Sequence, residues 1–228
     1  MLTNRQLVLP YILPYVAYVA LASLPAGILP SEVNYALRLV VVSGLLLWAR
    51  RWYCPLTGPG SPLVSTLWGI GAGLAGAWVW IALLSPFVSA QDASPWSSLS
   101  FWLRLAAAGL LVPVFEELLM RGYVFRVALQ WNQERQKGDG SALQTALDER
   151  SMNAVRPGEW SWAAVAISTL VFTAGHNVPE WPASIAYGLL MSLLWVYRKD
   201  LLSCIAAHAT TNIALACYVR ATGSWHLW

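Results

Sequence analysis

The chain has 228 residues, of which 57% are hydrophobic and 11% are charged, and this charged fraction is less than half of that in a typical soluble domain. These proportions exclude a water-soluble enzyme and favour a protein that lies within a lipid bilayer. The formal net charge of +3 comes from 14 Lys plus Arg against 11 Asp plus Glu, too small and scattered an excess to indicate a nucleic-acid partner.

Apolar blocks separated by short polar breaks predict about seven or eight transmembrane helices. A bilayer offers the backbone no hydrogen-bond partner, so each span must be a helix or part of a closed barrel. None of the blocks alternates as a barrel strand does, which leaves an all-α polytopic membrane helix bundle, a single integral membrane domain over residues 1–228. The expected spans are 7–29, 33–49, 63–88, 100–120, 160–176, 182–197 and 201–219.

The longest polar stretch, residues 130–159, mixes charges of both signs with glycine and proline. It is predicted to be a cytoplasmic loop insertion with a short surface helix around 143–150. If the amino terminus is cytoplasmic, eleven Lys and Arg residues lie on that side, and only Arg38, Arg104 and Arg220 lie nearer the other face. This distribution follows the positive-inside rule and predicts a cytoplasmic amino terminus.

The cysteines and glycines in and beside the spans are expected to serve helix packing and to have no catalytic or metal-binding role. Cys54, Cys204 and Cys217 show no CxxC spacing and are expected to pack within the bundle. Gly69 and Gly73 lie four residues apart in a hydrophobic span, which indicates a close approach between two helices.

Ionisable residues inside the spans are informative, because each costs free energy unless it is paired or faces a cavity. Glu116 and Glu117 are adjacent, and Arg121 lies four residues after Glu117 on the same helical face. Neighbouring helical side chains point about 100° apart, so the two carboxylates should meet different surroundings. We expect Glu117 to pair with Arg121, and Glu116 to act as a general base in a low-dielectric pocket. The alternative is that the helix ends here and both acids reach water.

Three further polar residues would complete a hydrolytic site. His176 precedes the helix-breaking Pro179, and His208 and Asn212 share one face of the last span. Together they would orient a water molecule and donate hydrogen bonds to an oxyanion. Alternatively, His176 merely follows a helix end, and the other two residues join helices by hydrogen bonds. Alternatively, one Glu and two His could bind a zinc ion, although the chain has no HExxH motif.

These residues form three motifs: EExxxR at Glu116, Glu117 and Arg121, FxxxH at Phe172 and His176, and HxxxN at His208 and Asn212. On these motifs, residues 100–220 resemble the catalytic core of the CAAX protease and bacteriocin-processing family of intramembrane proteases, whose eukaryotic members include the Ras-converting enzyme. The stretch NYALRLVVVSGLLLWARRWY is similar to the Trp-rich, PEP-CTERM-associated bacterial branch.

The resemblance implies a glutamate-dependent endopeptidase, with no cofactor, whose cavity lies within the membrane and opens toward the cytoplasm. Glu116 would activate water and His176 would help to hold it. His208 and Asn212 would stabilise the oxyanion, with the second glutamate and the arginine of the first motif as a supporting ion pair. The substrate would be a membrane-anchored or lipidated protein or peptide.

The linear order of the spans raises a difficulty. It would set His176 near the outer end of its helix and Glu116 near the inner end of its own, too far apart to cooperate. Either the helix before His176 starts deep in the membrane, or the NVPEWP segment is a helix break that lines a cavity.

We therefore expect an intramembrane endopeptidase of a prokaryotic cytoplasmic membrane. Three other functions remain open from the sequence: a non-catalytic immunity or scaffold protein that retains the motifs, a zinc-dependent membrane peptidase, and a transporter that relays protons through the buried Glu and His.

Overall fold

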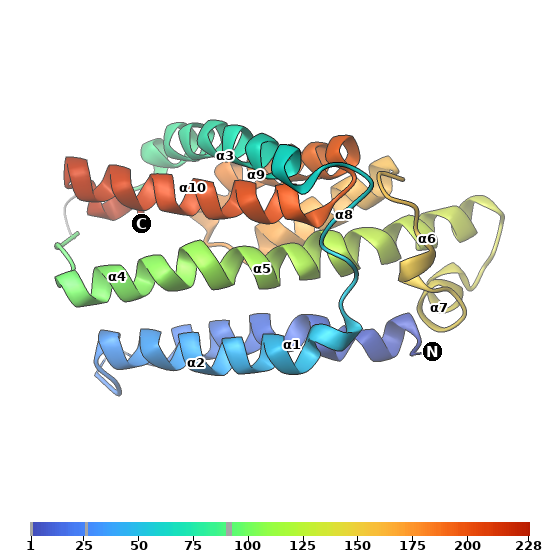
Figure 1. The fold of residues 1–228 in the computed structure, drawn as a ribbon, viewed down its shortest axis with the longest axis horizontal. Coiled ribbons are helices and arrows are strands. Elements are labelled where there is room, and N and C mark those ends of the chain that lie inside the picture. Colours follow the sequence, from blue (N-terminus) through green and yellow to red (C-terminus); the bar gives the residue numbers. More distant parts are fainter. Residues whose placement is uncertain (1, 26, 90–92) are drawn as a thin grey trace.

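The computed structural model describes residues 2–25, 27–89 and 93–228, and these residues form helices without any β-strand. In Figure 1, α1 and α2 lie on one side, the run from α4 to α6 lies in the middle, and α3, α9 and α10 lie on the other side. This arrangement confirms the expected all-α membrane bundle. The helices are α1 (Asn4–Ala22), α2 (Ser31–Ala49), α3 (Pro62–Leu84), α4 (Ser98–Ala106), α5 (Val112–Glu117), α6 (Phe125–Gln136), α7 (Ala142–Asp148), α8 (Trp162–Ala174), α9 (Trp181–Arg198) and α10 (Leu201–Thr222). Short 3-10 turns lie at Arg50–Trp52, Ser85–Phe87, Met152–Ala154, Val178–Glu180 and Trp225–Leu227.

Within the described residues, 5 helical stretches are long and apolar enough to cross a membrane, fewer than the expected number. They are Asn4–Ala22, Ser31–Trp52, Pro62–Phe87, Ser98–Gln136 and Leu201–Thr222. The expected spans 160–176 and 182–197 fall short, because α8 has only 13 residues and α9 has 18 with a less apolar composition. At 1.5 Å per residue, α8 is about 20 Å long, less than the hydrocarbon thickness of a bilayer.

Two helix ends differ from the expected boundaries. α1 ends at Ala22 and not near residue 29, because Pro25 follows and disfavours the helical conformation just before it. The span expected over 100–120 continues as helix to Gln136, where residues 125–129 are all buried. The polar loop therefore begins after this helix, and α7 takes the place of the expected short surface helix.

α1 stays helical although it contains Pro10 and Pro14. Pro14 has no N–H to donate to the carbonyl four residues earlier, so the Pro10 oxygen is left without its helical partner. The Tyr53 hydroxyl donates a hydrogen bond of 3.0 Å to this oxygen. A side chain from the segment after α2 therefore satisfies the group that the proline leaves unbonded.

Glycines of α3 let it lie directly against α10. A Cβ atom at Gly69 would come within 2.6 Å of the Ala206 Cβ, and one at Gly73 would clash with the Ala207 carbonyl. Thr211 uses this proximity to donate a hydrogen bond of 2.8 Å to the Gly73 oxygen. The close approach predicted from the glycine spacing is confirmed, and it fixes the helix that carries His208 and Asn212.

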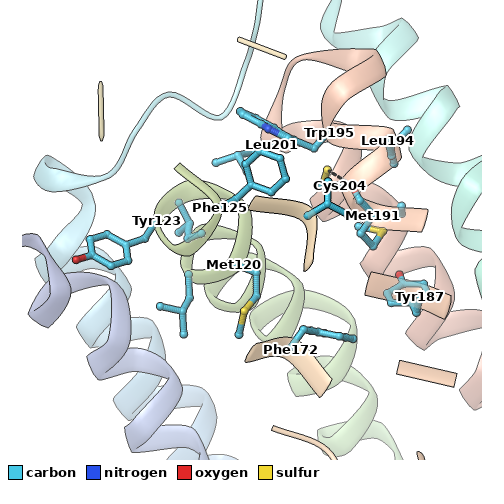
Figure 2. Close-up of a cluster of buried hydrophobic side chains, with 14 of the residues drawn as sticks. Met120, Tyr123, Phe125, Phe172, Tyr187, Met191, Leu194, Trp195, Leu201 and Cys204 are labelled. Carbon is cyan, nitrogen blue, oxygen red and sulfur yellow. Dashed lines mark hydrogen bonds between the residues drawn. The ribbon is translucent and has the colours of Figure 1, made fainter. Parts of the chain in front are cut away.

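A buried cluster of side chains joins the middle helix to α8, α9 and α10 (Figure 2). Phe125 and Trp195 pack with their ring centroids 6.3 Å apart, next to the thiol of Cys204. Cys54 and Cys204 are buried and unpaired, as their predicted packing role requires, whereas Cys217 is exposed. The cluster fixes the position of the middle helix relative to the last three helices.

Candidate active site

The helix that carries both adjacent acids contains two π-helical segments. Residues 98–136 form one continuous helix, in which Ala107–Leu111 and Leu118–Val124 have the wider π-helical turn. The two acids lie at the end of α5, the short α-helical stretch between these segments. π-Helical turns change the direction in which side chains project, and they occur frequently at functional sites.

The two neighbouring carboxylates meet different surroundings, as the helix geometry predicts. The Glu117 side chain is completely buried, whereas 14% of the Glu116 side chain is exposed. Arg121 Nη1 lies 3.2 Å from Glu117 Oε2, and this guanidinium is also completely buried. Glu117 and Arg121 therefore form the predicted ion pair, and Glu116 remains outside it.

Arg121 also connects the middle helix to its neighbours. Its Nη2 donates a hydrogen bond of 3.0 Å to the Gly188 carbonyl of α9. The guanidinium carbon lies 5.6 Å from the centroid of the Phe172 ring on α8. One buried cation thus holds together the helices that carry the first two motifs.

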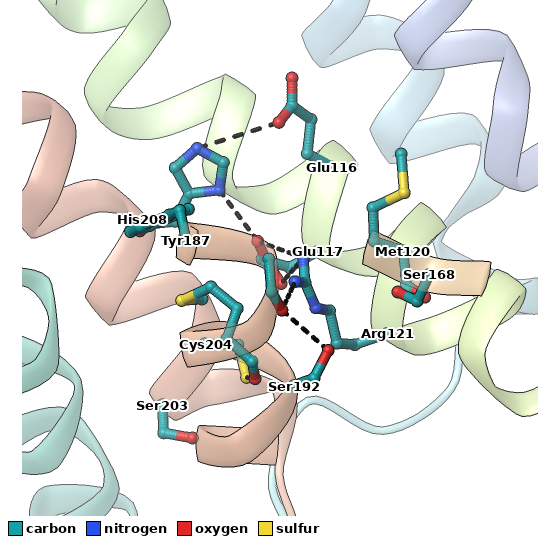
Figure 3. Close-up of polar contacts among 12 residues, drawn as sticks. Glu116, Glu117, Met120, Arg121, Ser168, Tyr187, Ser192, Ser203, Cys204 and His208 are labelled. Atoms are coloured by element: carbon teal, nitrogen blue, oxygen red, sulfur yellow. Dashed lines mark hydrogen bonds and ion pairs between the residues drawn. The ribbon is translucent and has the colours of Figure 1, made fainter. Parts of the chain in front are cut away.

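His208 lies between the two glutamates (Figure 3). Its Nδ1 is 2.9 Å from Glu117 Oε1, and its Nε2 is 3.9 Å from Glu116 Oε2. An ionised carboxylate can only accept hydrogen bonds, so Nδ1 carries the proton when Glu117 is ionised. The Nε2 atom is then the one that faces Glu116.

His176 lies in the break between α8 and the following 3-10 turn. Its Nδ1 is 2.9 Å from the Phe172 oxygen. A carbonyl can only accept, so Nδ1 is the donor, and Nε2 of the neutral ring has a free lone pair. Trp181 holds the break by donating from Nε1 to the His176 oxygen over 3.1 Å. Glu180 holds it from the other side by accepting hydrogen bonds of 2.8 and 3.0 Å from the backbone and side chain of Asn177.

Asn212 projects from α10 toward the first π-helical segment. Its Nδ2 donates a hydrogen bond of 2.7 Å to the Ala108 oxygen. A side-chain amide has two N–H groups, so this bond uses one of them and fixes the direction of the other.

A cavity of about 150 Å³ brings together the four residues predicted to be catalytic. Glu116, His176, His208 and Asn212 all line it, although they come from three separate parts of the chain. The difficulty over the depth of His176 is thereby removed. The short α8 ends inside the bundle, and the break after it lines the cavity.

Several residues of this cavity carry no motif and escaped the sequence prediction. The Trp80 ring of α3 packs against His176 with the ring centroids 5.4 Å apart. The Tyr187 ring of α9 packs against the His208 ring with the ring centroids 5.7 Å apart. Its hydroxyl donates a hydrogen bond of 3.0 Å to the Thr211 hydroxyl. These contacts connect helices far apart in the sequence, so no local pattern could have revealed them.

The cavity is directed toward one end of the bundle. From Glu116 its lining extends to Arg104 of α4 and to Trp228. In Figure 1 the start of α4 and the C-terminus lie at one end, and the N-terminus and α7 lie at the opposite end. The cavity therefore extends away from the end that carries the polar loop.

No cluster of three or more His, Cys, Asp or Glu side chains in metal-binding proximity occurs among the described residues. This arrangement differs from a closed structural zinc site, which needs about four protein ligands.

Comparison with known proteins identifies the family. A family model described as Type II CAAX prenyl endopeptidase Rce1-like matches residues 98–214, slightly more than half of the chain. None of the curated proteins or solved structures matches significantly. The matched region runs from the start of α4 through the HxxxN motif and includes all three motifs. The chain therefore belongs to the Rce1-like family of type II CAAX prenyl endopeptidases.

Proposed function

We propose that the protein is a glutamate-dependent intramembrane endopeptidase, in which Glu116 activates the water that attacks the peptide bond. One observation carries this proposal: Glu116, His176, His208 and Asn212 line a single cavity inside a membrane bundle. Membership of a family of CAAX proteases supports the reaction class.

In the first step, water binds between Glu116 and Nε2 of His176. Glu116 takes a proton from this water as its oxygen attacks the carbonyl carbon of the substrate. Only 14% of the Glu116 side chain is exposed, and this partial burial strengthens the interaction between the carboxylate and the bound water.

The oxyanion that forms in this step needs hydrogen-bond donors. In the proposed step, Nε2 of His208 donates from the doubly protonated ring, while Nδ1 donates to the Glu117 carboxylate over 2.9 Å. The second N–H of Asn212 is the other donor, because the first is bonded to Ala108. Collapse of the intermediate then breaks the C–N bond, and Glu116 returns its proton to the leaving amine.

The substrate in this proposal is a membrane-anchored or lipidated protein or peptide, which reaches the cavity from the bilayer or from the membrane surface. No organic cofactor takes part. A zinc-dependent peptidase is the alternative that the residue types allow, because zinc accepts Glu and His as ligands, but no three such side chains among the described residues are in metal-binding proximity.

The proposed location is a prokaryotic cytoplasmic membrane with the amino terminus in the cytoplasm. Most Lys and Arg residues gather at the end of the bundle that carries the amino terminus and α7, which favours the cytoplasm for that end. The lining of the cavity extends from Glu116 toward the opposite end, which in this orientation is the end away from the cytoplasm. This direction is the reverse of the one that the family resemblance implies.

The experiment that tests the function is proteolysis by the purified protein in proteoliposomes, against prenylated and unprenylated membrane-anchored peptides. Wild type should cleave at least one of these peptides, and Glu116→Gln should lower turnover below detection without loss of folding. Glu149→Gln, at an exposed position after α7, is the matched control and should cleave like wild type. Substantial turnover by Glu116→Gln would remove this residue from the role of base.

A further inference from the structure

Arg104 is a positively charged residue that lines the cavity, and it has no role in the reaction proposed above. It lies on α4, twelve residues before Glu116 on the same continuous helix, and it lines the same cavity. Its guanidinium carbon is 4.1 Å from the ring centroid of Trp96 and 4.6 Å from that of Trp228. The two indoles contact the guanidinium, and none of its N–H groups donates a hydrogen bond to a described residue.

Arg104 makes no direct ion pair with an acidic side chain among the residues that the structure describes, although Glu180 interacts with it electrostatically. It forms neither an ion pair nor a hydrogen bond with any of them, in contrast to the buried Arg121. Glu180 also lines the cavity, but its carboxylate is bonded to Asn177. A guanidinium carries five N–H donors and no acceptor, and it recognises carboxylates through paired hydrogen bonds.

We infer that Arg104 forms a carboxylate-binding subsite at the end of the cavity away from Glu116, and that it anchors a peptide substrate by an acidic group. This inference rests on the proposed peptidase function. The acidic group is either the terminal carboxylate of the peptide or an Asp or Glu side chain.

The helix sets the distance between this anchor and the bond that is cut. At the α-helical rise of about 1.5 Å, twelve residues set an upper bound of roughly 18 Å along the helix axis between the Cα atoms of Arg104 and Glu116, because the π-helical turn between them is wider and rises less per residue. An extended peptide advances about 3.3 Å per residue, so it covers this distance in about five residues. The recognised carboxylate should therefore lie within about five residues of the scissile bond.

Binding to the inactive Glu116→Gln protein in nanodiscs tests the subsite without dependence on cleavage. The probes are fluorescent apolar decapeptides in three forms: a free terminal carboxylate, an amidated terminus, and an amidated terminus with one internal glutamate. At least one carboxylate form should bind roughly 10- to 100-fold more tightly than the uncharged amide, measured by fluorescence anisotropy. Preference for the first or the third form identifies the source of the carboxylate.

Arg104→Gln in the same background should abolish the preference, and Arg104→Lys, which keeps the charge, should retain part of it. Arg220→Gln is the matched control, because Arg220 also contacts two aromatic rings but does not line the cavity. Equal binding of all three probes, or the same loss of preference in Arg220→Gln, would overturn the subsite. A retained preference together with no cleavage by wild type would instead contradict the proposed peptidase function.

Discussion

At the residue scale, the site depends on the different surroundings of two adjacent glutamates. Glu117 is enclosed by Arg121 and His208, whereas Glu116 faces the cavity. In the proposed mechanism Glu117 supports the site through its contacts with Arg121 and His208, and Glu116 binds the water. The sequence predicted this division from the helical angle between neighbours and the spacing to Arg121. It did not predict that His208 would contact both acids.

The buried ion pair should contribute strongly to stability. Arg121→Ala leaves the fully buried Glu117 carboxylate without its cation, and we expect a loss of about 3–5 kcal/mol in the free energy of unfolding. Equilibrium unfolding in detergent measures this loss. The double variant Glu117→Gln/Arg121→Gln should lose less, because it buries no unpaired charge. Wild-type stability of Arg121→Ala would mean that water reaches Glu117.

Asn212 should affect the chemical step more than folding. Asn212→Ala removes a proposed oxyanion donor, so kcat should fall roughly 10²- to 10³-fold with little change in KM. Steady-state kinetics on a cleaved peptide measures both constants, and thermal unfolding checks that the variant folds. An unchanged kcat would confine Asn212 to its hydrogen bond with Ala108.

At the scale of elements, the site depends on features that interrupt ideal helices. Two π-helical segments flank the glutamates, and α8 stops early so that His176 reaches the cavity. The sequence offered the NVPEWP break as one of two ways to bring His176 to Glu116. The π-helical segments were not predicted: each contains one glycine, Gly109 or Gly122, but a single glycine in an apolar helical run does not distinguish a π-helical turn from an α-helix.

The contact between α3 and α10 gives a prediction with a control on the same helix. A methyl group at Gly69 would clash with α10, whereas one at Gly71 would meet open space. Gly69→Ala should therefore lose about 1–3 kcal/mol of stability through overpacking. Gly71→Ala should be neutral or slightly stabilising. Thermal unfolding of the two variants compares them directly, and equal stability would show that the helices can separate at little cost.

At the scale of the whole molecule, composition was sufficient to predict a helical membrane bundle, and the three motifs named residues that the fold brings to one cavity, whose catalytic roles stay a prediction. The described residues give fewer candidate spans than expected, because α8 has only 13 residues and α9 does not reach the hydropathy of the five longer apolar stretches. Cavity residues such as Trp80 and Tyr187 were missed, because only tertiary packing brings them near the motifs.

The orientation of the bundle gives a prediction at this scale. If the positively charged end is cytoplasmic, the C-terminus and the cavity end near Arg104 lie on the other side of the membrane. Alkaline phosphatase fused to the C-terminus in bacterial cells should then be active, because it folds only outside the cytoplasm. A green fluorescent protein fused to the C-terminus should not fluoresce, because it would be carried to the same non-cytoplasmic side. The reverse pattern would place the Arg104 end of the cavity on the cytoplasmic side.

The most direct test of the central claim is single-turnover hydrolysis in ¹⁸O-labelled water by protein treated with a chelator. If Glu116 activates water without a metal, the new carboxylate of the product should contain one ¹⁸O atom, and Glu116 itself should contain none. Cleavage should proceed at the untreated rate, and Glu116→Gln should give no labelled product. Label in the Glu116 side chain would indicate a covalent intermediate, and loss of cleavage that added zinc restores would indicate a metallopeptidase; either result would contradict the account.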